Sequence, residues 1–149
     1  MKWRWLKDPI EPDDFETLEN CWGVRLPVDY RMCALENNGG VPAQVGIDIP
    51  GRGTTQFRAL LRIDRVGQAA NPVSAMSTWQ DIKDYLPGKL FPFASDPGGS
   101  FFCFLYSDSD AEPDVVFWTP EGWADDDPLD SVFPFCSTFT ELLGLFKEC

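Results

Sequence analysis

The chain has 149 residues, 44% of them hydrophobic and 14% aromatic, a composition that excludes whole-chain disorder and suits one domain spanning residues 1–149. With 24 acidic against 12 basic residues its formal net charge is −12, so binding to nucleic acid or an anionic membrane surface is not expected. The absence of histidine excludes histidine-dependent catalytic triads and zincin-type metal sites.

The first predicted helix spans Glu11 to Gly23. Pro12 suits the first helical position, the two aspartates after it favour the positive end of the helix dipole, and Gly23 suits the position past the last turn. Helical spacing predicts a buried face formed by Phe15, Leu18 and Trp22.

A second helix is predicted to begin at Pro27 and to end within Asn37–Gly40, because glycine adopts the left-handed conformation of a helix C-cap without steric cost. Only a few residues separate it from the first helix. The pair therefore predicts a helical hairpin that covers one face of a sheet, with an inner face formed by Tyr30, Cys33, Ala34 and Leu35.

The middle of the chain predicts strands and one short helix. A strand fragment and a loop are expected over residues 43–53. Residues 54–63 alternate as a half-buried strand would, with Phe57, Ala59, Leu61 and Ile63 on the buried face. Ser77 is expected to begin a helix with Gln80 in the capping-box position.

The second half predicts a strand pair, a further strand and a closing helix. Residues 90–106 indicate two strands joined by a turn at residues 96–99, the second apolar on both faces as in the centre of a sheet. Residues 114–119 indicate the next strand, and Thr138 with Glu141 forms a capping box for the last helix. The order of these helices and strands along the chain predicts an α+β fold in which helices pack on a largely antiparallel or mixed sheet.

The five cysteines fall at irregular spacings without a C-x-x-C pair, which is typical of reduced thiols in a cytosolic protein. Cys33 and Cys103 lie among apolar residues and are expected to fill the core. The N-terminal segment carries basic residues but no apolar run of signal-peptide length, and no stretch reaches 18 apolar residues. A cytoplasmic location is expected.

Two acidic stretches stand out as candidate partner-binding residues. The first, Asp108, Asp110, Glu112 and Asp114, alternates like part of a calcium loop, but Pro113 stands where such a loop needs glycine and Thr119 where it needs glutamate. No metal, cofactor or catalytic residue is expected. The second stretch holds Glu121, Trp123, Asp125, Asp126, Asp127 and Asp130.

The alternative for both acidic stretches is a solvated loop without a partner. Most of the six tryptophans are expected in the core. Trp79, Trp118 and Trp123 lie next to polar loops, where they could partly face a groove, and exposed tryptophan is typical of protein interfaces.

The N-terminal part of the chain holds Leu18-Glu19, Gly23-Val24-Arg25-Leu26-Pro27, Asp29-Tyr30 and Asn38-Gly39-Gly40. The blocks LFPFASDPGG, VVFW and STFTELLGLF follow. In sequence and in order, these blocks resemble the SUKH superfamily, whose eukaryotic founding member is a yeast regulator of cell-wall synthesis. The chain departs from the family at Ser100, where a polar amide or acid is common, and at Thr119-Pro120-Glu121, where a histidine–glutamate pair is frequent.

The resemblance implies an α+β domain and, in bacteria, an immunity protein that binds and neutralises a toxin, often a nuclease. Such a toxin tends to carry a positive active cleft, to which an acidic partner is steered rapidly. The eukaryotic branch suggests the alternative of an intracellular scaffold or regulatory domain. A hydrolase that uses two carboxylates is a third, minor alternative.

Overall fold

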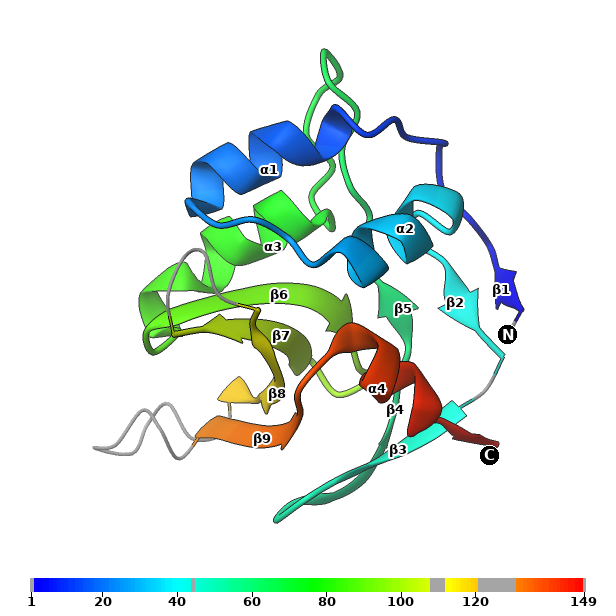
Figure 1. Cartoon of the computed structure of the whole chain (residues 1–149), viewed down its shortest axis with the longest axis vertical. Coiled ribbons are helices and arrows are strands. Elements are labelled where there is room, and N and C mark those ends of the chain that lie inside the picture. Colours follow the sequence, from blue (N-terminus) through cyan, green and yellow to red (C-terminus); the bar gives the residue numbers. More distant parts are fainter. Residues whose placement is uncertain (1, 44, 108–111, 121–130, 149) are drawn as a thin grey trace.

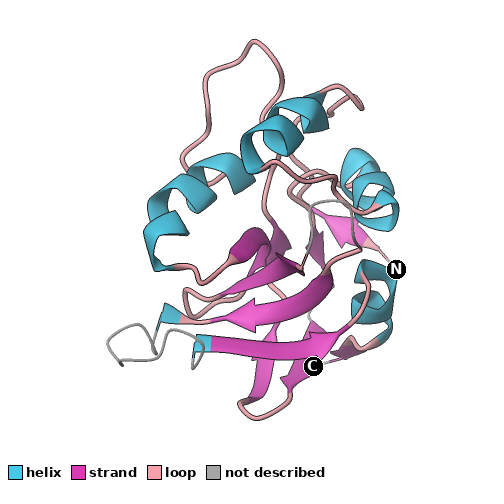
Figure 2. Cartoon of the chain, turned by 60° about the vertical axis from the view of Figure 1, so that its left-hand side comes forward, coloured by secondary structure: helices cyan, strands magenta, loops and turns pink. Residues whose placement is uncertain are grey.

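The computed structural model of the chain describes residues 2–43, 45–107, 112–120 and 131–148 (Figure 1). The described residues form an α+β fold, as the sequence predicts. Helices α1, α2 and α3 gather on one side of the largest sheet, and α4 lies beside the strands near the C-terminus (Figures 1 and 2).

The largest sheet has five antiparallel strands in the order β5-β6-β7-β8-β9. The central strand β7 is largely buried on both faces, which confirms the prediction from its continuous apolar sequence. The strands are β5 (Ala59–Leu60), β6 (Lys89–Ser95), β7 (Phe101–Tyr106), β8 (Asp114–Trp118) and β9 (Val132–Cys136).

The described residues also form two smaller antiparallel sheets. One has the order β10-β3-β4, and the other pairs β1 with β2. Their strands are β1 (Trp3–Arg4), β2 (Val41–Pro42), β3 (Val45–Ile49), β4 (Gly53–Gln56) and β10 (Lys147–Glu148).

The prediction of one continuous strand over residues 54–63 is wrong, because the chain passes there from one sheet to another. The backbone N–H of Phe57 donates to Val45 of β3 (3.2 Å), whereas the N–H of the next residue, Arg58, donates to Ser95 of β6 (2.9 Å). Leu60 and Leu61 are both buried, so the expected alternation of buried and exposed residues also fails.

The helices are α1 (Asp14–Trp22), α2 (Val28–Glu36), α3 (Ala75–Ile82), which continues into a 3₁₀ turn (Lys83–Tyr85), and α4 (Phe139–Gly144). Gly23 ends α1 in the left-handed conformation, with φ 71°, as predicted. Helix α3 begins earlier than predicted, because the hydroxyl of Ser74 accepts from the backbone N–H of Ser77 and so caps the helix.

A cluster of aromatic rings joins the helices to the sheet. Tyr30 of α2 makes edge-to-face contacts with Phe93 of β6, Phe104 of β7 and Phe139 of α4, at centroid distances of 5.7, 5.2 and 5.5 Å. Such contacts add about 0.5–1.5 kcal/mol each to the burial of the rings. A smaller apolar cluster contains Leu90, Cys103, Val116 and Trp118.

Candidate functional site

The predicted partner-binding residues fall mostly on parts of the chain outside the described residues. Two of them are described: Glu112 and Asp114 are both exposed, and Asp114 is the first residue of β8. The others, which lie outside the description, are Asp108, Asp110, Glu121, Trp123, Asp125, Asp126, Asp127 and Asp130.

The attachment points of the two acidic stretches lie at opposite ends of β8. Residues 108–114 lead into the strand at Asp114, and residues 121–130 follow it after Trp118, about 13 Å further along at the usual strand rise. The residues that flank the second stretch are joined to each other. The N–H of Thr119 donates to the carbonyl of Ser131 (3.0 Å), and both residues are buried.

The tryptophans are distributed differently from the prediction. Trp118 is 2% exposed and belongs to the small apolar cluster, so it does not face a groove. Trp79 is half-buried beside Trp22 and Phe91. The tryptophan that stands out is Trp5, which is 72% exposed and was not singled out by its sequence context.

Trp5 lies at a groove of about 720 Å³ beside the edge strand β5, here called the β5 groove. Its walls come from residues near 5–7, 39–41, 58–62, 72–78 and 95–101, which are far apart in the sequence. The side chains that give the groove its character are Trp5, Lys7, Arg58, Arg62, Val73 and Phe101.

Asn38 holds one wall of the β5 groove together. Its side chain is buried, donates to the carbonyls of Asp8 (2.8 Å) and Ile63 (3.3 Å), and accepts from the N–H of Ile63 (2.8 Å). Its own carbonyl accepts from the N–H of Lys7 (2.7 Å). One amide residue thus joins the end of α2 to the N-terminal segment and to the strand segment that carries Arg62.

The two glycines after Asn38 allow close packing at this wall. A Cβ at Gly39 would overlap with Cγ of Lys7 and would lie 3.2 Å from Cβ of Arg62. Gly39 also has φ 65°, which other residues adopt at a steric cost. A Cβ at Gly40 would lie 2.9 Å from a methyl carbon of Leu6. The Asn-Gly-Gly motif therefore sets the positions of Lys7 and Arg62.

A tight turn at residues 96–100 forms another wall. The carboxylate of Asp96 accepts hydrogen bonds from the N–H groups of Gly98 (3.0 Å) and Ser100 (2.8 Å) and from the hydroxyl of Thr55 (2.9 Å). Gly99 has φ 86°, which glycine tolerates without cost. Asp96 is thus occupied in holding the turn that joins β6 to β7.

The β5 groove is locally positive on a strongly acidic chain. Lys7, Arg58 and Arg62 line it, whereas Asp96 is its one acidic lining residue among those described. Nη2 of Arg62 lies 3.8 Å from Asp8, a long ion pair, and the buried Nε of Arg62 has no hydrogen-bond partner among the described residues.

The backbone around Trp5 presents its indole to solvent. Trp5 has φ 54°, unusual for a bulky residue and unique among the described non-glycine residues. It lies between two fixed points, the β1–β2 pairing at Arg4 and the hydrogen bond made by Lys7. Strained residues held in this way are typical of binding sites.

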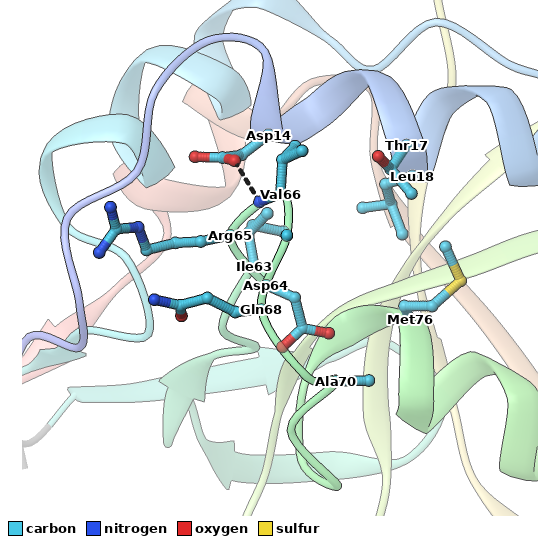
Figure 3. A pocket seen from close by; sticks show the side chains of 11 residues that line it. Asp14, Thr17, Leu18, Ile63, Asp64, Arg65, Val66, Gln68, Ala70 and Met76 are labelled. Atoms are coloured by element: carbon cyan, nitrogen blue, oxygen red, sulfur yellow. Dashed lines mark hydrogen bonds between the residues drawn. The ribbon is translucent and has the colours of Figure 1, made fainter.

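A smaller pocket of about 220 Å³ lies between α1, α3 and the loop over residues 64–70 (Figure 3). Its two carboxylates accept hydrogen bonds from backbone N–H groups. Asp14 accepts from the N–H groups of Glu11 and Val66, both at 2.7 Å, and Asp64 accepts from the N–H of Asn71 at 3.0 Å. The bond between Asp14 and Val66 attaches the loop to α1, and the bond between Asp64 and Asn71 closes the loop, which favours a structural role for this pocket.

The buried thiols and phenols are poorly suited to reaction. Burial raises the pKa of the Cys136 thiol to about 12, and it also raises the pKa values of the Cys103 thiol and the Tyr30 phenol. In the described part of the chain no group of three or more His, Cys, Asp or Glu side chains is placed to hold a metal ion, and no described helix is long and apolar enough to cross a membrane.

Residues 9–144 match the SMI1 / KNR4 family (SUKH-1). Because this match spans most of the 149 residues, the chain belongs to that family, which confirms the resemblance noted from the sequence. No individual curated protein matches the chain. The signature Asn38-Gly39-Gly40 and the block ending in Asp96-Pro97-Gly98-Gly99 lie within the matched region, and Gly39, Asp96, Pro97 and Gly99 line the β5 groove.

Proposed function

We propose that this chain is an immunity-type protein that binds a basic bacterial toxin, such as a nuclease, in the cytoplasm and neutralises it by occluding its active cleft. Membership of the SMI1 / KNR4 family across residues 9–144 is the observation that carries this proposal. The family is associated with immunity and regulatory roles rather than with catalysis, and the net charge of −12 suits a basic partner.

The acidic stretches at residues 108–114 and 121–130 are the proposed contact surface. Glu112 and Asp114 are exposed, and the attachment points of the two stretches lie about 13 Å apart along β8. A standard protein interface buries about 800 Å² on each partner, which is wide enough to include both ends of this strand.

Binding to the product of a toxin gene adjacent in the genome tests this proposal. Purified chain and an inactive variant of that toxin are expected to form a one-to-one complex with nanomolar affinity in titration calorimetry. In a separate assay, the free chain is expected to inhibit the active toxin in proportion to the amount of chain added. A toxin that remains fully active with excess chain would contradict the proposal.

The alternative is an intracellular scaffold or regulatory domain that recognises other proteins without a toxin. Family membership fits this role as well, and the exposed Trp5 beside the β5 groove favours a protein-binding surface. A gene without a toxin neighbour, together with stable binding to a host regulatory protein, would favour this alternative.

A further inference from the structure

We propose that the β5 groove binds an acidic peptide segment of a partner protein, with its carboxylates paired to Lys7, Arg58 and Arg62 and an apolar side chain placed against Trp5. This site involves none of the acidic stretches assigned to the toxin. It therefore does not rest on the proposed function, and the two can fail separately.

Charge complementarity is the first argument. Three of the 12 basic residues of the chain line this one groove. Asp96 is the one acidic lining residue among those described and offsets one of these three charges, so the lining keeps a net positive charge. The groove is therefore a local site for carboxylates on a molecule that otherwise repels them.

Arg62 has unused hydrogen-bonding capacity. Nη2 of Arg62 lies 3.8 Å from Oδ2 of Asp8, which is longer than a hydrogen bond, so a closer acceptor can take the place of Asp8. Guanidinium groups form paired, charge-assisted hydrogen bonds with carboxylates. A glutamate or aspartate in the groove would satisfy Arg62 better than Asp8 does.

The apolar lining favours a peptide over nucleic acid. Leu60, Leu61 and Phe101 lie among the cations, while Trp5 and Val73 are 72% and 64% exposed. Tryptophan and arginine are enriched among the residues that dominate protein interfaces. A polynucleotide presents a phosphate at every step, which a chain of net charge −12 disfavours, whereas a peptide can alternate carboxylates with apolar side chains.

Fluorescence anisotropy with a labelled nonapeptide tests the proposal. The probe alternates Glu or Asp with Leu or Phe, and its matched control carries Gln and Asn in place of the acids. The full chain is expected to bind the acidic probe at least tenfold more tightly than the amide control. In NMR, the indole N–H signal assigned by its loss in Trp5→Phe is expected to shift when the acidic probe is added.

Two variants test whether the probe binds in the β5 groove. Trp5→Ala and Arg58→Glu are each expected to weaken binding of the acidic probe roughly tenfold or more. Both side chains are exposed, so the variants are expected to fold, which a thermal melt checks. Arg65→Glu makes the same charge change as Arg58→Glu outside the groove, and Met32→Ala removes another exposed apolar side chain; both are expected to change affinity less than about twofold.

Each other outcome overturns the proposal. The groove does not bind an acidic peptide if the acidic probe fails to bind or if the amide control binds equally well. Unchanged affinity in Trp5→Ala and Arg58→Glu would lead to the same conclusion. Tighter binding of a thymidine nonanucleotide, lost in the same variants, would assign the groove to nucleic acid. Self-association that is abolished by Arg58→Glu in sedimentation would assign it to a second copy of the chain.

Discussion

The carboxylate of Asp29 in α2 accepts two hydrogen bonds from Thr140 at the start of α4, one from its backbone N–H and one from its hydroxyl, both at 2.9 Å. The two residues are 111 positions apart. An acidic side chain of one helix therefore supplies an acceptor to the N-terminus of another, where free N–H groups and the helix dipole favour negative charge.

Replacement of Asp29 by alanine is expected to lower the free energy of unfolding by about 1–2 kcal/mol, because these hydrogen bonds are charge-assisted but partly exposed. Urea denaturation measures the change. Thr140→Ala removes the hydroxyl bond and leaves the backbone bond, so it is expected to cost less. If the double variant cost the sum of both single changes, the two side chains would not interact in the folded protein.

Gly39→Ala is expected to destabilise the protein more than Gly23→Ala. Both glycines have a left-handed backbone, which costs an alanine about 1–2 kcal/mol. A Cβ at Gly23 meets nothing within 4 Å, whereas one at Gly39 displaces Lys7 and crowds Arg62. The difference between the two variants in thermal or urea unfolding measures this crowding. Equal losses of stability would show that Lys7 and Arg62 move aside without a measurable energetic cost.

Neutralisation of the second acidic stretch is expected to weaken binding of the toxin. Asp125→Asn, Asp126→Asn and Asp127→Asn together remove three negative charges from a contact that depends on charge, so affinity and its salt dependence are both expected to fall. Titration calorimetry at two salt concentrations measures both the affinity and its salt dependence.

The matched control for that variant is Glu16→Gln, Asp81→Asn and Asp84→Asn, which makes the same charge change on the exposed surfaces of α1, α3 and the 3₁₀ turn. It is expected to change toxin affinity little. If both triple variants lost the same affinity, total charge rather than a defined surface would guide the association.

Alkaline pH is expected to reduce stability through the buried thiols. Burial raises the pKa of Cys136 to about 12 and also raises the pKa of Cys103, so both lie above the value of about 8.5 in an unfolded chain. The unfolded state therefore loses these protons first. The stabilisation is complete below about pH 8.5 and declines as the pH rises from there toward the pKa of the folded state.

Thiol reactivity and denaturation as functions of pH check this expectation. At pH 8 a disulfide reagent is expected to modify the exposed Cys21 rapidly, and Cys103 and Cys136 only on unfolding. Rapid modification of Cys103 in the folded protein would contradict its burial.

Local signals made the ends of α1 and α4 predictable, whereas the error over residues 54–63 comes from long-range contacts. The end of α1 at Gly23 and the start of α4 at Thr138 follow from single residues and their near neighbours, and both are confirmed. The strand predicted over residues 54–63 failed because its alternation does not show where the chain passes between sheets.

The β5 groove could not be predicted for the same reason. Trp5, Lys7, Arg58 and Arg62 belong to segments that come together only through Asn38 and the turn held by Asp96. In the sequence they are separate polar or aromatic residues without periodicity. The Asn38-Gly39-Gly40 motif stands out in the sequence, but its glycines indicate the end of the second helix and not the packing site of Lys7 and Arg62.

The passage between sheets at Phe57 and Arg58 gives the chain two adjacent reporters of local opening. The amide hydrogen of Phe57 exchanges with solvent only when its bond to β3 opens, and that of Arg58 only when its bond to β6 opens. Two neighbouring peptide groups thus monitor two sheets. Equal protection factors would mean that the sheets open as one cooperative unit, and unequal factors that one can open while the other stays closed.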